Sequence, residues 1–273
     1  MAVIVINQQL GSRGAELGQL VASELGYRYM GRADLMTEAS RIYHVDPDLF
    51  MRFYEREPHF WERSRIDNER LIWFLRAICF REMARDRMVY VSSYGAHLLP
   101  DNGCWLRVRV IAALPGRVKY VAEAEKLSEA AADKRVREHD REVRARAATL
   151  WGIDVEDPNL YHLVLNTTTL SLETLCAALK ACAERVSAAC DGRGWQELKD
   201  AAITAQVRAA LLSHPKFGHA QVEVLCKAGA VQVNGPGLVA PWDELVRQVA
   251  GKIEGVKSVQ VGAQEPALPL RSE

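Results

Sequence analysis

The chain has 273 residues, of which 49% are hydrophobic and 26% are charged, a composition typical of globular proteins. Its 35 basic and 35 acidic residues give a formal net charge of zero, so electrostatics give no reason to expect binding to nucleic acid or to an anionic membrane. No apolar run is long enough for a transmembrane helix, and the apolar run at residues 2–6 is too short for a secretion signal. We therefore expect a cytoplasmic protein with no transmembrane segment and with one large domain or two smaller ones.

The six cysteines do not form a C-x-x-C pair, so the sequence contains no zinc-binding or thiol-redox motif of that kind, and we predict no metal site. Several of them lie within apolar helical patterns, where free cysteine is commonly buried. We therefore expect reduced, buried thiols. The cysteines are Cys79, Cys104, Cys176, Cys182, Cys190 and Cys226.

The first elements are a strand, a turn and a helix. Residues 2–6 form a continuous apolar run rich in β-branched side chains, which is typical of a strand buried on both faces of a parallel sheet. A polar turn with two glycines follows at residues 7–14. The next residues repeat apolar side chains every fourth position, as in a helix, and Gly26 ends that pattern. In this order of elements, the helix N-terminus presents backbone N–H groups that suit a phosphate.

Strands and helices alternate over the next part of the chain. Residues 34–87 have a mostly helical pattern, with breaks at Pro47 and Pro58. Further strands are predicted at residues 88–91, 106–112 and 162–165, and further helices at residues 128–150, with Ser128 as N-cap, and at residues 171–190. Such alternation is typical of an α/β domain with a parallel sheet.

The pattern changes after residues 191–194, a short polar segment with two glycines that we interpret as a domain boundary. The elements predicted beyond it are a helix at residues 197–212, strands at 220–226 and 230–234, a helix at 241–253 and a strand at 256–262. This order predicts a second, smaller α+β domain.

The turn before the first helix is the strongest candidate for a binding site. A complete phosphate loop has a lysine and then a serine or threonine after its last glycine, and these bind the phosphates and Mg²⁺. Here Ala15 and Glu16 follow, and the carboxylate of Glu16 would repel a phosphate. The residues that we expect to hold a phosphate are Gly11, Ser12, Arg13 and Gly14.

Three stretches of the chain resemble the cytidylate-kinase-like family. Residues 6–18 are similar to the family's G-S-G-G-R-E loop, and residues 25–29 to its L-G-[YF]-x-[YF] second strand. Residues 151–167, which read W-G-I-D, D-P and Y-H-L-V-L-N-T in order, are similar to the family's F-G-x-D, D-P and Y-D-L-V-L-N-T close. The resemblance covers about residues 1–185. It implies a P-loop-type parallel sheet flanked by helices, and ATP with Mg²⁺ as the cofactor.

The chain departs from the family's pattern at charged positions. Arg13 stands in place of the second loop glycine, and Ala15 stands in place of the arginine after the glycines. The family's Y-D-R-E reads M-G-R-A at residues 30–33, without the acid, and residues 92–96 lack the arginine of its G-R-G-A element. Because phosphoryl transfer depends on charge placed around the phosphates, these changes argue against efficient transfer.

The helix predicted at residues 128–150 carries a row of basic side chains. Lys134, Arg137, Arg141 and Arg144 share one helical face, where the resemblance places the mobile lid of these kinases. The family's D-x-x-R reads D-R-E-V at residues 140–143, so Arg144 lies next to the arginine position. The alternative is a solvated face whose arginines pair with acids on the same helix. The candidate catalytic residues are Arg13, Arg137, Arg141 and Arg144.

The C-terminal region resembles a BON domain. Residues 229–235 match its G-x-V-x-[LV]-x-G turn, and residues 255–259 match its G-V-x-x-V close. The resemblance implies a module with no catalytic residues that binds phospholipid, a small ligand or a protein; packing or dimerisation is the alternative. The predicted domains are a cytidylate-kinase-like P-loop domain at residues 1–190 and a BON-like domain at residues 196–264.

These features lead to three hypotheses about function. The first is a nucleotide-binding protein with a degenerate phosphate loop, weak or absent phosphoryl transfer, and a sensing role through the BON-like domain. The second is an active ATP-dependent nucleoside monophosphate (CMP-like) kinase, and the third is a non-catalytic structural or assembly protein. The expected partners are a nucleotide or other phosphorylated small molecule at the loop and an unidentified ligand or protein at the BON-like domain; no nucleic acid is expected, and an oligomer is compatible with the sequence.

Overall fold

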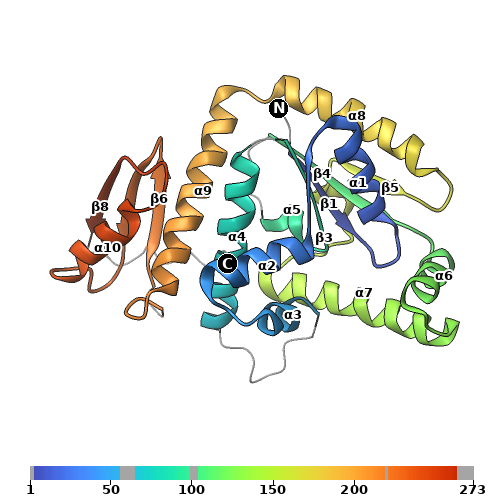
Figure 1. Ribbon diagram of the computed structural model, residues 1–273, viewed down its shortest axis with the longest axis horizontal. Coiled ribbons are helices and arrows are strands. Elements are labelled where there is room, and N and C mark those ends of the chain that lie inside the picture. The colour runs from blue at the N-terminus through green and yellow to red at the C-terminus, as the bar shows by residue number, and fades with distance from the viewer. Residues whose placement is uncertain (1–2, 56–64, 86, 99–103, 219–220, 263–273) are drawn as a thin grey trace, which may run out of the picture.

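The computed structural model describes residues 3–55, 65–85, 87–98, 104–218 and 221–262 (Figure 1). Its main feature is a five-stranded parallel sheet with strand order β2-β3-β1-β4-β5, which confirms the predicted α/β class. The strands are β1 (Val3–Gln8), β2 (Arg28–Gly31), β3 (Met88–Ser92), β4 (Trp105–Ile111) and β5 (Leu163–Asn166).

Strand β1 lies at the centre of this sheet and is buried from Val3 to Asn7, as its apolar run predicts. It pairs with β3 on one side and with β4 on the other, so Asn7 is level with Ser92 and Arg109. After β1 the chain forms β2 and β3 on one side of it, and it later forms β4 and β5 on the other side. The carboxyl end of β1 is therefore the point at which ligands bind in open parallel sheets.

Helices cover both faces of the sheet. Ile4 and Ile6 point to the face covered by α1 (Gly14–Leu25) and α8 (Leu172–Ala189), whereas Val3 and Val5 point to the face covered mainly by α4 (Arg65–Ala84). The other helices of this unit are α2 (Arg32–Tyr43), α3 (Pro47–Glu55), α5 (Gly95–Leu98), α6 (Leu114–Glu125) and α7 (Glu129–Trp151). Pro58 lies outside the described residues.

Helix α6 was not predicted from the sequence. Pro115 and Gly116 suggest a turn, yet Pro115 occupies the first turn of α6. Proline fits there because its fixed φ suits a helix start and the N–H that it lacks would have no partner inside the helix. Helix α7 then begins after Ser128, whose side chain accepts a hydrogen bond from Ala131 N as predicted for an N-cap.

The small C-terminal sheet pairs β6 (Glu223–Lys227) antiparallel to β7 (Ala230–Asn234) and β7 parallel to β8 (Ser258–Gly262). With α9 (Gly192–Ser213) and α10 (Trp242–Gly251), the order α-β-β-α-β is the one expected. The BON-like identity of this unit stays a prediction.

Helix α9 lies between α4 and the small sheet (Figure 1). It begins within the segment interpreted as a boundary, and it has two apolar faces. Leu198, Ala205 and Leu212 pack into the core of the parallel sheet, whereas Val207 and Leu211 pack into the core of the small sheet. One helix thus serves both units, and the predicted division at residues 190 and 196 falls near its start.

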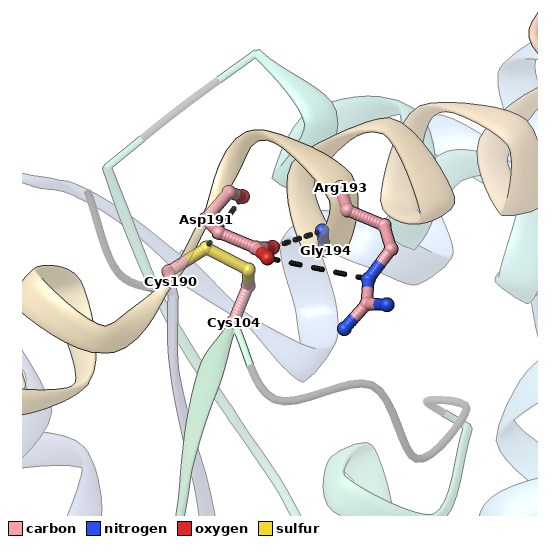
Figure 2. Close-up of a disulfide and its surroundings, with 5 residues drawn as sticks. All are labelled: Cys104, Cys190, Asp191, Arg193 and Gly194. Carbon is pink, nitrogen blue, oxygen red and sulfur yellow. Dashed lines mark hydrogen bonds and ion pairs between the residues drawn. A yellow bond between two sulfur atoms is a disulfide. The ribbon is translucent and has the colours of Figure 1, made fainter.

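A disulfide joins Cys104, just before β4, to Cys190, at the end of α8, with a Cα–Cα distance of 5.0 Å (Figure 2). The expectation that all six cysteines are reduced is therefore wrong for these two. Their separation of 86 residues hid the pair, because only the folded chain brings them together. Beside it, Asp191 accepts a hydrogen bond of 2.8 Å from Gly194 N and caps α9 (Figure 2). The free cysteines are Cys79, Cys176, Cys182 and Cys226.

Among the described residues, no helix combines the length and the apolar character needed to cross a membrane.

Candidate functional site

The predicted phosphate loop lies at the carboxyl end of β1 and leads into α1. Gly11 has φ of 77°, and a Cβ there would lie 2.6 Å from the carbonyl oxygen of Arg117 on α6, so the loop can approach that helix only through glycine. Arg13 has φ of 59° and ψ of 22°, the left-handed conformation that glycine adopts easily. The loop therefore keeps a glycine-like backbone at the position where the sequence has lost the glycine.

Hydrogen bonds inside the loop brace it from within. The backbone N–H and the hydroxyl of Ser12 both donate to the carbonyl oxygen of Gln9, at 3.1 and 2.7 Å. Thr167, from the predicted N-T close, donates its hydroxyl to the carbonyl oxygen of Ser12 at 2.9 Å. The first N–H groups of α1 have no partner within the helix and lie at the positive end of its dipole. This arrangement can accept a phosphate, although the Ser12 hydroxyl proton is already committed to Gln9.

The side chain of Arg13 folds back onto α1 and binds Glu16. Arg13 Nε and Nη2 donate to Glu16 Oε2 at 3.0 and 2.6 Å. The hydrogen bond from Arg13 lowers the pKa of Glu16, with a smaller contribution from Tyr120 on α6. The charge of Arg13 is therefore offset by a carboxylate at the mouth of the loop.

A second cation, missed as a site residue by the sequence analysis, lies deeper. Arg109 on β4 is only 5% exposed, and among the described residues no hydrogen-bond partner is found for its Nη1 atom. Its guanidinium carbon lies 5.9 Å from the centre of the Tyr161 ring. A charged side chain in a largely apolar strand, β4, which also carries Arg107, was the signal that could have identified it, because an arginine is rarely buried without a ligand or a partner.

A polar network around Asn7 lies beside Arg109, which is level with Asn7 in the sheet. Asn7 Oδ1 accepts a hydrogen bond of 2.9 Å from Ala96 N at the start of α5, and its Nδ2 donates to the Tyr161 hydroxyl at 3.3 Å and lies 3.1 Å from His97 Nε2. The Tyr161 hydroxyl donates to the carbonyl oxygen of Val155 at 2.8 Å. The network fixes the ring beneath Arg109 and thereby the position of its charge.

Helix α7 lies near the carboxyl end of β1. A cavity of about 10 Å³, enough for about one water molecule, separates it from Gln8, Gln9 and Arg109. Gln8, Gln9 and Arg109 line one side, and Asp140 and Arg144 are among the residues on the other.

Arg117 on α6 holds α7 in this position. Its Nη1 and Nη2 atoms donate to the two carboxylate oxygens of Asp140 at 2.9 and 2.8 Å, and the two side chains are 6% and 18% exposed. Arg117 Nη1 also lies 3.4 Å from the carbonyl oxygen of Leu10, to which it donates. One guanidinium thus connects α6, α7 and the phosphate loop.

The basic row on α7 mostly faces solvent, whereas Val136, His139 and Val143 are buried. Arg137 pairs with Asp133 at 2.8 Å, and Arg141 is exposed. The structure brings Arg144 to the small cavity, where it also pairs with Glu156 at 3.2 Å. The other candidates of this helix do not line that cavity.

Acidification is expected to destabilise the fold through His139, which is 7% exposed. Burial lowers its pKa to about 4, with Arg32, Arg135 and Arg117 acting in the same direction and Asp140 opposing them. His139 in the unfolded chain therefore takes up a proton near pH 6.5, whereas His139 in the folded chain stays neutral at that pH. Stability should fall by about 1.4 kcal/mol per pH unit for this histidine as the pH drops from about 6.5 to about 4.

Urea denaturation at several pH values above about 5, where most carboxylates stay ionised, would measure this slope. His139→Gln should reduce it. His97, whose pKa burial also lowers to about 4, would supply the remaining slope. An unchanged slope in His139→Gln would contradict the assignment.

No group of three or more histidine, cysteine, aspartate or glutamate side chains that could hold a metal ion is found within the described ranges.

The chain is similar to known proteins in sequence and in fold. Residues 3–169 match the cytidylate kinase-like family. The chain is 24% identical over 185 residues to a cytidylate kinase from Thermococcus kodakarensis, covering 68% of this chain and 89% of that protein. It is 25% identical over 179 residues to a cytidylate kinase from Pyrococcus horikoshii, covering 66% and 86%. The structure of an uncharacterized protein from Eubacterium ventriosum is similar with a TM-score of 0.52 at 13% identity, covering 67% of this chain and 99% of that one.

The structural likeness supports the fold alone, since the identity to that protein is low. The sequence match supports family membership as well as fold. It spans more than half of the chain and includes the loop, the strands and the N-T close on which the resemblance rests. The chain belongs to the cytidylate kinase-like family.

Proposed function

We propose that this protein binds a nucleotide through residues 11–14 and transfers phosphoryl groups weakly or not at all. The observation that carries the proposal is the pairing of Arg13 with Glu16 at the loop, where a kinase needs positive charge free to meet phosphate. The loop keeps a glycine-like backbone at Arg13, but the charge of that arginine is paired with a carboxylate.

Two features support nucleotide binding: the backbone N–H groups at the start of α1 and the buried side chain of Arg109. The N-terminus of α1 is braced by Thr167 and lies close to α6 at Gly11, so its N–H groups are held in place without a ligand. Arg109, whose buried Nη1 atom no described residue satisfies, lines the cavity beside Gln8 and Gln9. A buried N–H donor without an acceptor is costly, and an anionic ligand that accepts from it would offset that cost.

The same residues fit Mg²⁺ poorly. Ala15 stands where a complete phosphate loop has its lysine, and Glu16 stands where that loop has the serine or threonine whose hydroxyl binds the metal. What the chain retains is phosphate binding by backbone and arginine. Since the two archaeal relatives are named cytidylate kinases, CMP and ATP are the first ligands to test.

A route for a sensing role runs from the sheet to the C-terminal unit. Arg28 at the start of β2 donates to Glu82 on α4 at 2.8 Å, α4 packs along α9, and α9 contributes to the core of the small sheet. We assign the readout of the bound state to that BON-like unit.

Two other functions have an observation in their favour. Arg109 and Arg144 both line the cavity beside the loop and could replace the missing charges of an active CMP-like kinase. A structural or assembly role is favoured by the small size, about 10 Å³, of the cavity between α7 and the end of β1.

Restoring the family's arginine tests the proposal. Wild type should bind ATP in a calorimetric titration, and Ala15→Arg should bind it about tenfold more tightly because a charge-assisted hydrogen bond to phosphate is added. Ala15→Gln, a long polar side chain without charge, is the matched control and should leave the affinity unchanged. If neither wild type nor Ala15→Arg binds any nucleotide, the structural role is favoured and the proposal fails.

A further inference from the structure

A larger cavity, of about 340 Å³, lies between the two units and away from the phosphate loop. Its volume is in the range of small-molecule sites. Helix α4 forms one wall, α9 the floor, and the β6–β7 turn and the loop before β8 the other wall. The short side chains of Ala84, Ala202 and Ala228 leave this space open.

Two glycines and an aspartate hold the far wall in place. Gly229 has φ of 85°, and a Cβ there would lie 2.7 Å from the carbonyl oxygen of Gly255, so the two loops meet closely. Asp200 on α9 accepts hydrogen bonds from Ala228 N at 2.8 Å and Gly229 N at 3.2 Å. The β6–β7 turn is thereby fixed to α9, and the cavity is preformed.

Positive charge dominates the lining. The cations are Arg81 on α4, Arg85 directly after α4, Lys199 on α9 and Lys257 in the loop before β8, and Glu254 is the acid among the lining residues. Cations therefore outnumber carboxylates in the lining by four to one. Neither lysine forms an ion pair or side-chain hydrogen bond with any residue in the described part of the chain.

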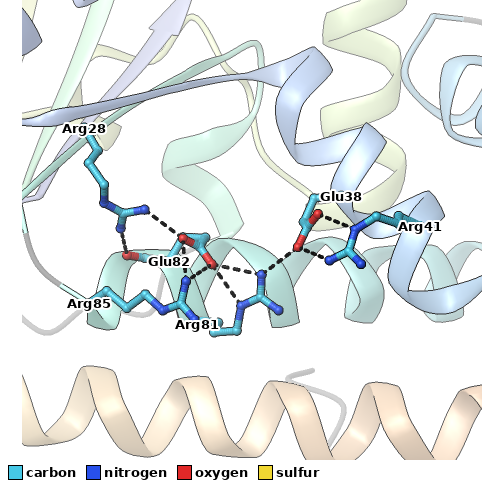
Figure 3. Close-up of polar contacts among 6 residues, drawn as sticks. All are labelled: Arg28, Glu38, Arg41, Arg81, Glu82 and Arg85. Carbon is cyan, nitrogen blue, oxygen red and sulfur yellow. Dashed lines mark hydrogen bonds and ion pairs between the residues drawn. The ribbon is translucent and has the colours of Figure 1, made fainter.

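The two arginines are oriented by a cluster beside the cavity (Figure 3). Glu82 accepts from Arg81 Nε at 2.9 Å, from Arg85 Nη1 at 3.1 Å and from Arg28. Glu38 accepts from Arg81 Nη2 at 3.1 Å and from Arg41. In this cluster four arginines share two carboxylates, so the excess of positive charge extends along α4 and is not cancelled by its neighbours.

We propose that this cavity binds a small molecule carrying a phosphate or diphosphate group, which Lys199 and Lys257 contact from one side and Arg81 and Arg85 from the other. A phosphate suits it because several acceptor oxygens and more than one negative charge can meet separate cations at once. The ligand would join α4 of the family-matched unit to the C-terminal unit. The site does not depend on the phosphate loop.

Inorganic pyrophosphate is the first probe, titrated calorimetrically into the full chain. Lys199→Ala/Lys257→Ala should weaken binding by about tenfold or more, because two charge-assisted contacts are lost. Both side chains are exposed, so the fold should tolerate their removal. Lys119→Ala/Lys252→Ala removes the same charge from exposed positions outside the cavity and should bind as wild type does.

Hydrogen exchange locates the bound pyrophosphate. We expect slower exchange in peptides covering residues 226–232 and 252–258, independently of any change at residues 9–16. Protection at residues 9–16 alone, or equal weakening in the two double variants, would overturn the proposal while leaving nucleotide binding at the loop untouched.

The same phosphate could belong to a lipid headgroup. Co-sedimentation with phosphatidylglycerol vesicles that Lys199→Ala/Lys257→Ala abolishes would assign the site to a lipid. Binding of pyrophosphate with no vesicle binding would assign it to a free phosphorylated molecule.

Discussion

Replacing both Cys104 and Cys190 with alanine is expected to lower the free energy of unfolding by about 4 kcal/mol. The disulfide links residues 86 positions apart, and it connects the start of β4 with the end of α8 (Figure 2). Without it the unfolded chain gains the freedom of a long open loop, which favours unfolding. The loss should appear as a lower urea midpoint with wild type kept free of reductant.

Cys182→Ala is the matched control, because Cys182 is a partly buried free thiol on α8. It should change stability far less than the double replacement. Unfolded wild type without reductant should show four reactive thiols, since two of the six cysteines are bonded. Six reactive thiols would contradict the disulfide.

Asp140→Ala is expected to destabilise the protein by about 3–5 kcal/mol. Its carboxylate is the charge partner of Arg117, whose side chain is 6% exposed and donates two hydrogen bonds to it at 2.9 and 2.8 Å. Removing one partner leaves a buried charge uncompensated. The same change should release α7 from α6, so amide exchange in α7 should speed up.

The control for Asp140→Ala lies on the same helix. Asp133 pairs with Arg137 at 2.8 Å, but that pair is exposed to solvent, so Asp133→Ala should have little effect on urea stability. If Asp140→Ala costs no more than Asp133→Ala, Arg117 does not hold α7 by this contact.

The sequence predicted those elements whose formation depends on residues close together in the chain. The apolar run of β1, the turn after it and the helix that ends at Gly26 all follow from short-range periodicity and turn chemistry. Ser128 and Ser171 cap α7 and α8 through their own hydroxyl groups. The predicted parallel sheet and the family resemblance over residues 3–169 are confirmed.

What the sequence did not predict depends on residues that meet only after folding. Arg109 becomes a site residue because β4 pairs with β1 in a register that places it level with Asn7. The basic row on α7 has a helical spacing, yet spacing alone does not say which face of the helix is buried, and burial of Val136 and Val143 turns Arg137 outward. Helix α9 was predicted to belong to the C-terminal domain, and the sequence did not show that Leu198 and Leu212 also pack it into the core of the parallel sheet.

The most direct test of the central claim is the amount of CDP formed by wild type from CMP and ATP with Mg²⁺, at an ATP concentration that calorimetry shows to be saturating. We predict that the protein is occupied by ATP and that CDP stays at the level of an enzyme-free blank. CDP formation at about 1–100 per second per protein molecule, the range of ordinary kinases, would contradict the claim and identify an active nucleoside monophosphate kinase.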